Sequence, residues 1–217
     1  MPNNKIWGVD SAVAVTEELF QCVKSNFGYP KYWGRYLAEV ADVSDGLTKE
    51  EITLIRNKGI KVMPLYNIHA SAVGYEQGRV MARNAVFHVR KLGIPENVVI
   101  FASIEKSLEV DEAFIRAWVE TILPTGYRSG FYVDPVAGEF SSAYCEAIKN
   151  NADIAVQSIL WSAEPEQGVT KENRAPRYKP ASPRCRSNVW AWQYGRNAPQ
   201  CPINTNLADR KLVNYLY

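Results

Sequence analysis

The stretch Val98-Val-Ile-Phe-Ala-Ser-Ile-Glu105 is a nearly continuous apolar run that ends on an acid. A run of this length between polar segments is typical of a strand that is buried on both faces of a parallel sheet. A second run, Ile6-Trp-Gly-Val-Asp10, has the same form and also ends on an acid. The two runs predict buried parallel strands whose carboxyl ends carry Glu105 and Asp10.

Strand-like and helix-like segments alternate along most of the chain, as in a parallel sheet with crossover helices. The predicted strands are residues 6–10, 32–37, 60–66, 98–105, 127–133, 154–161 and 188–194, and helices are expected near 16–23, 48–58, 75–92, 111–123 and 140–149. Thr16 and Thr48 are placed to cap two of these helices, and Glu51 completes a capping box with Thr48. The alternation fails after residue 161.

We therefore predict one α/β domain over residues 1–217, a TIM-type (β/α)8 barrel with missing or shortened helices toward the C-terminus. The rival fold is a doubly wound open sheet. That fold usually places a Gly-rich phosphate loop after the first strand, and Gly8-Val-Asp-Ser-Ala has no such loop.

The composition argues against a nucleic-acid-binding, membrane-spanning or metal-dependent protein. The formal net charge is only +2, which gives no electrostatic footprint for nucleic acid, and no apolar run reaches the roughly 20 residues of a membrane span. Two histidines, His69 and His88, and four cysteines without a CxxC pair predict no metal site. We expect no cofactor and a neutral polysaccharide or glycan as partner, while the oligomeric state stays open.

The four cysteines are Cys22, Cys145, Cys185 and Cys201. Cys185 and Cys201 bracket a strand-like segment in loop-rich sequence. They either form a disulfide with each other or remain unpaired thiols.

Several motifs in this order resemble one known family. They are Trp7-Gly-Val-Asp10, Gly34-Arg-Tyr-Leu37, Gly59-Ile-Lys-Val-Met-Pro-Leu-Tyr66, Ala102-Ser-Ile-Glu105, Gly130-Phe-Tyr132 and Trp190-Ala-Trp-Gln-Tyr194. The chain resembles the glycoside hydrolase-like domain family known as DUF1906, a relative of the family 25 muramidases. The resemblance implies a barrel that acts on bacterial cell-wall polysaccharide, such as peptidoglycan.

Two acids of the muramidase pattern are missing. Where that pattern has Asp-x-Glu on the fourth strand, this chain has Ser103-Ile-Glu105, and its counterpart of the late Asp-x-Asn is Asn204-Thr-Asn206. Asp10 and Glu105 are therefore the acids left at matching positions.

Glu105 is our candidate for the general acid, because the apolar residues before it would desolvate the carboxyl and favour its neutral form. Asp10 is either the second catalytic acid or the group that orients a substrate amide. The structural alternatives are an ion-paired acid for Glu105 and a helix cap or structural hydrogen bond for Asp10.

The expected substrate-binding residues lie at or near strand ends, which face the ligand in a barrel. They are Arg35, Tyr66, Asn67, Tyr132, Asp134, Gln157, Trp161, Trp192 and Gln193. Arg35 either pairs with Asp10 or Glu105 or points outward. Trp190 and Trp192 are two residues apart, so they should share one face of the last strand, as a sugar platform or as core packing.

The sequence predicts a glycosidase of lysozyme or muramidase type that works outside the cell or at the cell wall, although no signal segment precedes the first strand. The alternative is a non-catalytic carbohydrate-binding barrel that has lost part of its site.

Overall fold

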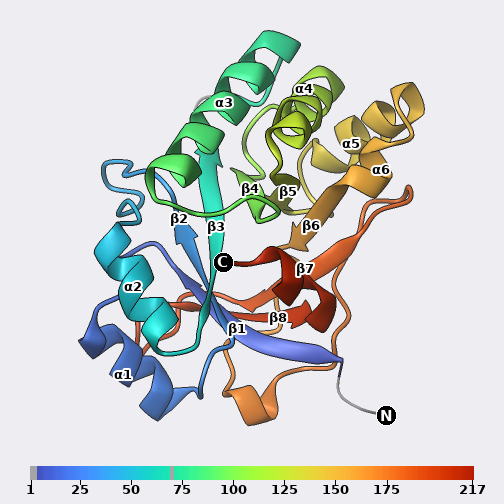
Figure 1. Ribbon diagram of the computed structural model, residues 1–217. Helices are drawn as coiled ribbons and strands as arrows, with labels where there is room; N and C mark the ends of the chain where they lie inside the picture. Colours follow the sequence, from blue (N-terminus) through green and yellow to red (C-terminus); the bar gives the residue numbers. More distant parts are fainter. Residues whose placement is uncertain (1–3, 69–70) are drawn as a thin grey trace.

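The computed structural model describes residues 4–68 and 71–217 and shows a closed barrel whose eight strands follow one another in sequence order (Figure 1). The strands are β1 (Lys5–Ser11), β2 (Tyr32–Tyr36), β3 (Lys61–Ile68), β4 (Val99–Ile104), β5 (Arg128–Val133), β6 (Ser158–Ser162), β7 (Val189–Gly195) and β8 (Asn204–Asp209). The predicted α/β barrel of TIM type is confirmed.

The last strand departs from the parallel pattern. β8 runs antiparallel to both β7 and β1, whereas the neighbouring pairs from β1 to β7 are parallel. The segment expected to be the final inner strand is in fact β7, and Asn204–Asp209 closes the barrel. An antiparallel return needs no crossover helix, which is why a short loop joins the last two strands.

The helices follow the first five strands. They are α1 (Glu17–Asn26), α2 (Lys49–Asn57), α3 (Tyr75–Lys91), α4 (Glu112–Ile122), α5 (Phe140–Asn150) and the short α6 (Ile154–Gln157), with 3-10 turns η1 (Leu123–Thr125), η2 (Glu172–Arg174) and η3 (Arg210–Tyr215). Thr16 and Thr48 cap α1 and α2 as predicted. The prediction of a strand from residue 154 is wrong in its first half, because residues 154–157 form α6.

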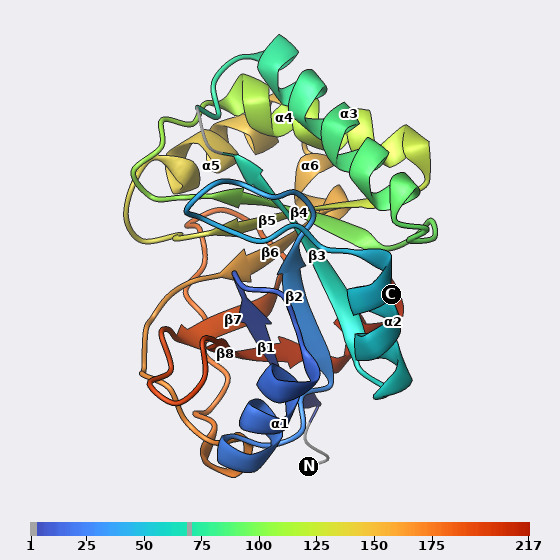
Figure 2. The same ribbon diagram turned by 90° about the vertical axis from the view of Figure 1, so that its left-hand side faces the viewer.

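The helices cover only part of the barrel. Figures 1 and 2 show α3, α4, α5 and α6 together on one side, with α1 and α2 beside β1 to β3. The connection from β6 to β7 has no α-helix and crosses the remaining side, where Gln167 N–H bonds the Tyr194 carbonyl and Glu172 N–H bonds the Phe27 carbonyl. The expected loss of helices toward the C-terminus is confirmed.

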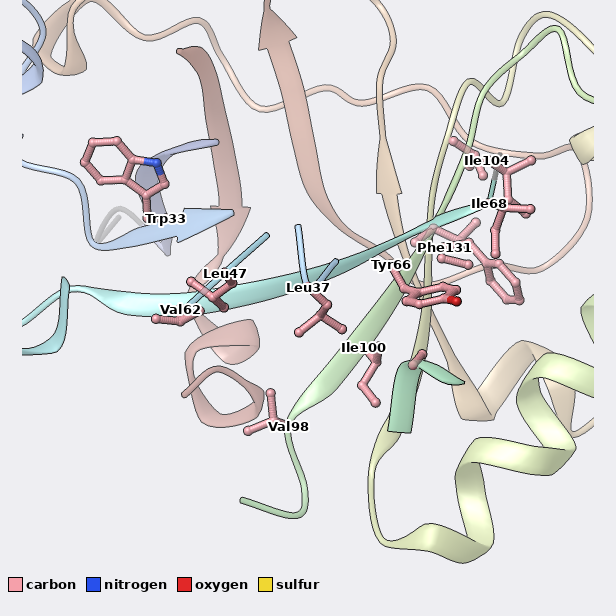
Figure 3. Packing of buried hydrophobic residues seen from close by; sticks show 14 of the residues in the cluster. Trp33, Leu37, Leu47, Val62, Tyr66, Ile68, Val98, Ile100, Ile104 and Phe131 are labelled. Carbon is pink, nitrogen blue, oxygen red and sulfur yellow. The ribbon is translucent and has the colours of Figure 1, made fainter. Parts of the chain in front are cut away.

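Strand alternation divides the buried side chains into two clusters. Met63 and Leu65 of β3 point into the barrel, whereas Val62, Tyr66 and Ile68 belong to the layer between strands and helices, which Figure 3 shows. This parity decides which strand-end residues can face the mouth of the barrel.

Two disulfides join helices to the late loops: Cys22 of α1 bonds Cys201, and Cys145 of α5 bonds Cys185. The suggested pairing of Cys185 with Cys201 is wrong. Both bridges hold loops that have no helix of their own, so they replace part of the missing layer.

Candidate active site

Asp10 lies at the carboxyl end of β1 with its side chain inside the barrel. Its neighbours in register are Gly34 on β2 and Asn204 on β8. The residue is only 4% exposed. A Cβ atom on Gly34 would come within 2.7 Å of Asp10 Cβ and 2.8 Å of Trp161 Cη2, so glycine is required here for Asp10 to pack against the barrel interior.

Three side-chain amides donate hydrogen bonds to the Asp10 carboxylate. Gln193 Nε2 and Asn206 Nδ2 reach Oδ1 at 3.0 and 2.6 Å, and Asn204 Nδ2 reaches Oδ2 at 2.8 Å. Gln193 comes from β7, while Asn204 and Asn206 come from β8. The last two strands therefore supply the donors that hold the acid of β1, and these three residues, Gln193, Asn204 and Asn206, form the Asp10 cradle.

The Gln193 amide has a fixed orientation. Its Oε1 accepts hydrogen bonds from the Tyr132 hydroxyl at 2.8 Å and from Arg196 Nε at 2.9 Å. Because Arg196 can only donate, its contact fixes the amide oxygen on that side and turns the NH2 group of Gln193 toward Asp10, and the Tyr132 hydroxyl then donates to the same oxygen.

The two asparagines are oriented in the same way. Trp161 Nε1 donates to Asn206 Oδ1 at 2.9 Å, and the backbone N–H of Asn197 donates to Asn204 Oδ1 at 2.9 Å. Each of the three amides thus has its oxygen occupied by another donor and its nitrogen turned to the carboxylate.

Burial and hydrogen bonding oppose each other at Asp10. Desolvation raises the pKa of this carboxyl, and the donors on Asn206, Asn204 and Gln193, followed by the charge of Arg196, lower it. The net effect is a pKa above the ordinary value for an aspartate. A carboxyl of this kind titrates nearer to neutral pH than an exposed one.

Glu105 follows the last residue of β4 and is exposed. The apolar surroundings that we expected around its carboxyl are therefore absent, because Phe101 and Ile104 pack inside the protein while Glu105 faces solvent. Of the two acids, Asp10 and not Glu105 is the one that is buried at this end of the barrel.

Two tyrosines connect the surroundings of the two acids. Burial raises the pKa of the Tyr36 and Tyr132 hydroxyls, and the negative charges of both Asp10 and Glu105 raise them further. Both acids thus act on the same pair of hydroxyls at the carboxyl end of the barrel. Ser103, where the fourth strand lacks an acid, neighbours the Tyr36 hydroxyl.

Four of the predicted binding residues face this end of the barrel. Tyr132, Trp161 and Gln193 belong to the Asp10 network, and Asn67 Nδ2 donates to Ser44 Oγ at 2.9 Å. Asp134 lies just beyond β5, where Oδ1 accepts from the backbone N–H groups of residues 136 and 137 at 2.8 and 2.9 Å. Its observed role is to shape the loop after β5.

The side chain of Arg35 lies away from the barrel mouth. It is fully buried and points outward to α2, where Nε binds Glu51 Oε1 at 2.5 Å and Nη1 binds the Ser11 carbonyl at 2.8 Å. Outward orientation was one of the two alternatives, and Glu51 is the partner that neutralises the buried charge. Glu51 therefore serves Arg35, not the backbone N–H of Thr48 that a capping box would use.

Three further residues predicted to bind ligand lie away from the barrel mouth because of strand parity or strand direction. Tyr66 belongs to the outer layer (Figure 3), and its ring centroid lies 6.3 Å from that of Trp118. Gln157 ends α6 and precedes β6, at the opposite end of the barrel from Asp10. Trp192 is buried in the outer layer, with Nε1 bonded to the Pro165 carbonyl at 3.1 Å.

The proposed tryptophan platform is also wrong. The pairing of β6 with β7 shifts between Leu160 and Trp161, so that β7 has one extra residue at Trp190. Trp190 consequently packs against Tyr215 and the inner cluster, whereas Trp192 lies in the outer one. A bulge reverses the faces of the residues that follow it, and sequence spacing alone does not reveal one.

Sequence reasoning missed Arg196 and Tyr36 and did not assign the two asparagines of β8 to Asp10. Tyr36 has the same strand parity as Gly34, and this would have placed its side chain inside the barrel.

The two histidines of the chain are His69 and His88. His88 lies on α3 beside Tyr66, and His69 lies outside the described residues. Among the described residues no group of His, Cys, Asp and Glu could hold a metal ion, and no helix there is long and apolar enough to cross a membrane.

The rim of the barrel mouth is partly apolar. Val13, Val43, Val73 and Val136 are exposed, and each belongs to a different loop that follows a strand. A cavity of about 250 Å³ lies between the first two of these loops and is lined by Ala12, Val13 and residues 39–45. A ligand at the mouth would meet these apolar side chains beside the polar network around Asp10.

The comparisons with known proteins agree with the fold. The profile of a family described as Rv2525c-like, glycoside hydrolase-like domain, matches residues 21–208. A crystal structure of an uncharacterized B. stearothermophilus protein is 61% identical, with a TM-score of 0.97, and the match covers 98% of this chain and 100% of that one. The comparison with curated proteins gave no match.

More distant structures share the fold. The Clostridium perfringens spore cortex lytic enzyme SleM has a TM-score of 0.62 at 13% identity, over 97% of this chain and 69% of that one. The muramidase from Acremonium alcalophilum has a TM-score of 0.59 at 16% identity, over 96% and 99%. At such identities the likeness concerns the barrel and not its chemistry.

Proposed function

The chain belongs to the Rv2525c-like glycoside hydrolase-like domain family, and on that premise we propose that it is a glycosidase that cleaves a polysaccharide of the bacterial cell wall. The observation that carries the proposal is the Asp10 carboxylate, which three oriented amides hold at the carboxyl end of the barrel. A barrel of this type carries its chemistry at that end.

Glu105 is the proposed general acid. Its exposed position just past β4 leaves the carboxyl free to reach the oxygen of a glycosidic bond. Protonation of that oxygen allows the bond to the anomeric carbon to break.

Asp10 is proposed to orient the substrate. Oδ2 accepts one hydrogen bond from within the described part of the chain, and a carboxylate oxygen has room for two. The free position can accept the N–H of an acetamido group on the sugar. The acetamido oxygen then attacks the anomeric carbon while the leaving oxygen takes the proton of Glu105. In the second step a water molecule attacks the anomeric carbon and opens the cyclic intermediate, and the Glu105 carboxylate takes a proton from that water.

The proposed site of action is the cell wall, outside the cytoplasm. Two disulfides support an oxidising compartment. The printed names of SleM and of the fungal muramidase support a wall glycan as the substrate class.

The test is the release of reducing ends from purified peptidoglycan. We expect the wild type to release them and Glu105→Gln to lose at least 100-fold in rate, because general acid catalysis contributes about 10² to 10⁴. Glu109→Gln is the matched control, since Glu109 is an exposed acid of the same loop. Equal rates for Glu105→Gln and Glu109→Gln would remove Glu105 from the mechanism.

A second function has specific support. Ser103 provides no acid on β4, and Asn204 provides an amide where the muramidase pattern has an acid. A carbohydrate-binding barrel without turnover would keep the Asp10 cradle for recognition. Saccharide binding that Asp10→Ala abolishes, together with no release of reducing ends, would identify this second function.

A further inference from the structure

The outer face of α3 exposes apolar side chains that the barrel does not use. Phe87 is 62% exposed and Val80 is 46% exposed, while Ala82, Ala85 and Val89 pack inward. Phe87 lies in the second half of α3, on one helical face with Val80, so the two side chains form an apolar surface on that face.

A groove runs beside Phe87. It has a volume of about 600 Å³ and lies between α3 and the end of α4 with the turn η1. Its lining residues are Arg83, Val86, Phe87, Arg90, Lys91, Thr121 and Thr125. The lining thus contains three cations, one exposed ring and no carboxylate.

The three cations have no acidic partner within the described part of the chain. Arg83, Arg90 and Lys91 are exposed and form no ion pair there, whereas Arg79 on the same helix pairs with Glu76 at 2.9 Å. Cations in the last turn of a helix are favoured by its dipole, which accounts for Arg90 and Lys91 but not for Arg83.

The acid that α4 offers nearby is already engaged. Glu120 Oε2 accepts from the Tyr75 hydroxyl at 2.6 Å, and Oε1 accepts from Asn151 Nδ2 at 3.4 Å. Glu96 also lies nearby, beside Gly126 and Tyr127, but forms no ion pair with Arg90 in the described part of the chain. Arg90 Nη2 donates to the Thr125 carbonyl, at 3.4 Å. The cations of the groove therefore have no ion-pair partner there and are open to an anionic ligand.

We propose that this groove binds a linear polymer with phosphates along its backbone, as a second site outside the barrel. Guanidinium groups match phosphate oxygens with two parallel hydrogen bonds. Arg83 and Arg90 are seven residues apart, about 10 Å along the helix, so successive phosphates of one chain can meet both. Phe87 lies between them and offers its face to the apolar part of the repeating unit.

The concave shape favours a chain over a membrane surface. A bilayer needs protruding apolar side chains to enter it, whereas a groove encloses a thin extended ligand. The interaction is electrostatic in origin, so its affinity should fall as salt rises.

Fluorescence anisotropy with labelled inorganic polyphosphate tests the proposal on the intact protein. We expect binding that weakens with salt and falls at least tenfold in the Arg83→Gln/Arg90→Gln variant and in Phe87→Ser. Arg79→Gln is the matched control, because Arg79 is already paired, and it should bind like the wild type. Thermal unfolding of each variant checks that the fold is retained.

Three outcomes would overturn the proposal: undiminished binding by the double variant, equal affinity for polyglutamate, or binding to anionic lipid vesicles without binding to polyphosphate. The readout does not involve hydrolysis, so loss of the proposed glycosidase function would leave this test intact. The variants alter a helix outside the barrel and should hydrolyse a soluble glycan at the wild-type rate.

Discussion

At the scale of single residues, Arg196 is the positioning residue behind Asp10. It bonds Gln193 at 2.9 Å and the Ala163 carbonyl at 3.0 Å, and it touches Asp10 only through the Gln193 amide. Its positive charge lowers the pKa of the Asp10 carboxyl. The other charged or titratable groups that act around this site are Glu164, which pairs with Arg196 at 3.9 Å, and Tyr32, Tyr36, Tyr132 and Glu105.

We predict that Arg196→Met raises the pKa of Asp10, because it removes a nearby positive charge and loosens one amide donor. The measurement is the NMR titration of the Asp10 carboxyl carbon, which needs no enzymatic activity. Arg196→Lys keeps the charge and should shift the midpoint less. A midpoint that stays at the wild-type value in Arg196→Met would contradict this role for Arg196.

A second prediction concerns stability and pH. The pKa of folded Asp10 lies above its value in the unfolded chain, so between the two values the folded state binds more protons. The free energy of unfolding must then fall as pH rises through that interval. Asp10→Asn removes this contribution.

Urea unfolding of the wild type and of Asp10→Asn at several pH values checks the sign. We expect Asp10→Asn to become more stable relative to the wild type as the pH rises above about 4, which is near the ordinary pKa of an aspartate. A difference that is constant with pH would show that Asp10 does not titrate differently in the folded state.

At the scale of elements, α2 is attached to the barrel by a buried ion pair. Arg35 of β2 and Glu51 of α2 are both buried, and Glu51 Oε1 also accepts from the Val15 backbone N–H at 2.9 Å. Removing one partner of such a pair leaves an uncompensated buried charge.

We therefore predict that Glu51→Ala lowers the free energy of unfolding by about 3–5 kcal/mol. Glu146→Ala is the comparison, since Glu146 forms an exposed pair with Lys149 and such pairs contribute less than about 1 kcal/mol. Chemical denaturation of both variants gives the two values. Similar losses would mean that the Arg35 pair stabilises no more than a surface pair does.

The elements also show what the sequence could predict. Continuous apolar runs and capping threonines located β1 to β5 and their helices, because periodicity and caps are local signals. β8, Asn204–Asp209, was missed as the closing strand because four of its six residues are polar and their partners, Asp10 above all, lie almost 200 positions away in sequence. The bulge at Trp190 likewise depends on the pairing of β7 with β6 and leaves no mark in the spacing of residues.

In the candidate site, too, local sequence signals were predictable and long-range packing was not. Asp10 was found because an acid at the end of a buried strand is visible in the sequence, and Glu105 for the same reason. The solvent exposure of Glu105 and the outward direction of Arg35 were not accessible, since they depend on where α2 and the loop after β4 pack. Strand parity counted from Gly34 would have added Tyr36 and excluded Tyr66.

At the scale of the whole molecule, the barrel is closed by its two ends. β8 pairs with β1, Lys5 binds Asp209 at 2.7 Å, and the Arg210 N–H bonds the Asn4 carbonyl. The disulfide from Cys22 to Cys201 joins the first helix to the loop just before β8. One covalent bond thus fixes the strand that carries Asn204 and Asn206 against the part of the chain that carries Asp10.

The sequence separation of this bridge is 179, against 40 for the bridge between Cys145 and Cys185. A crosslink restricts the unfolded chain more when it closes a longer loop, and a native disulfide typically contributes about 2–4 kcal/mol. We predict that the Cys22→Ser/Cys201→Ser variant loses about this amount and more than Cys145→Ser/Cys185→Ser does. Urea unfolding measures both losses, and weaker binding of an oligosaccharide by the first variant alone would show that the bridge also holds the Asp10 cradle. A larger loss from the shorter bridge would instead place the dominant constraint at α5, away from the closing strand.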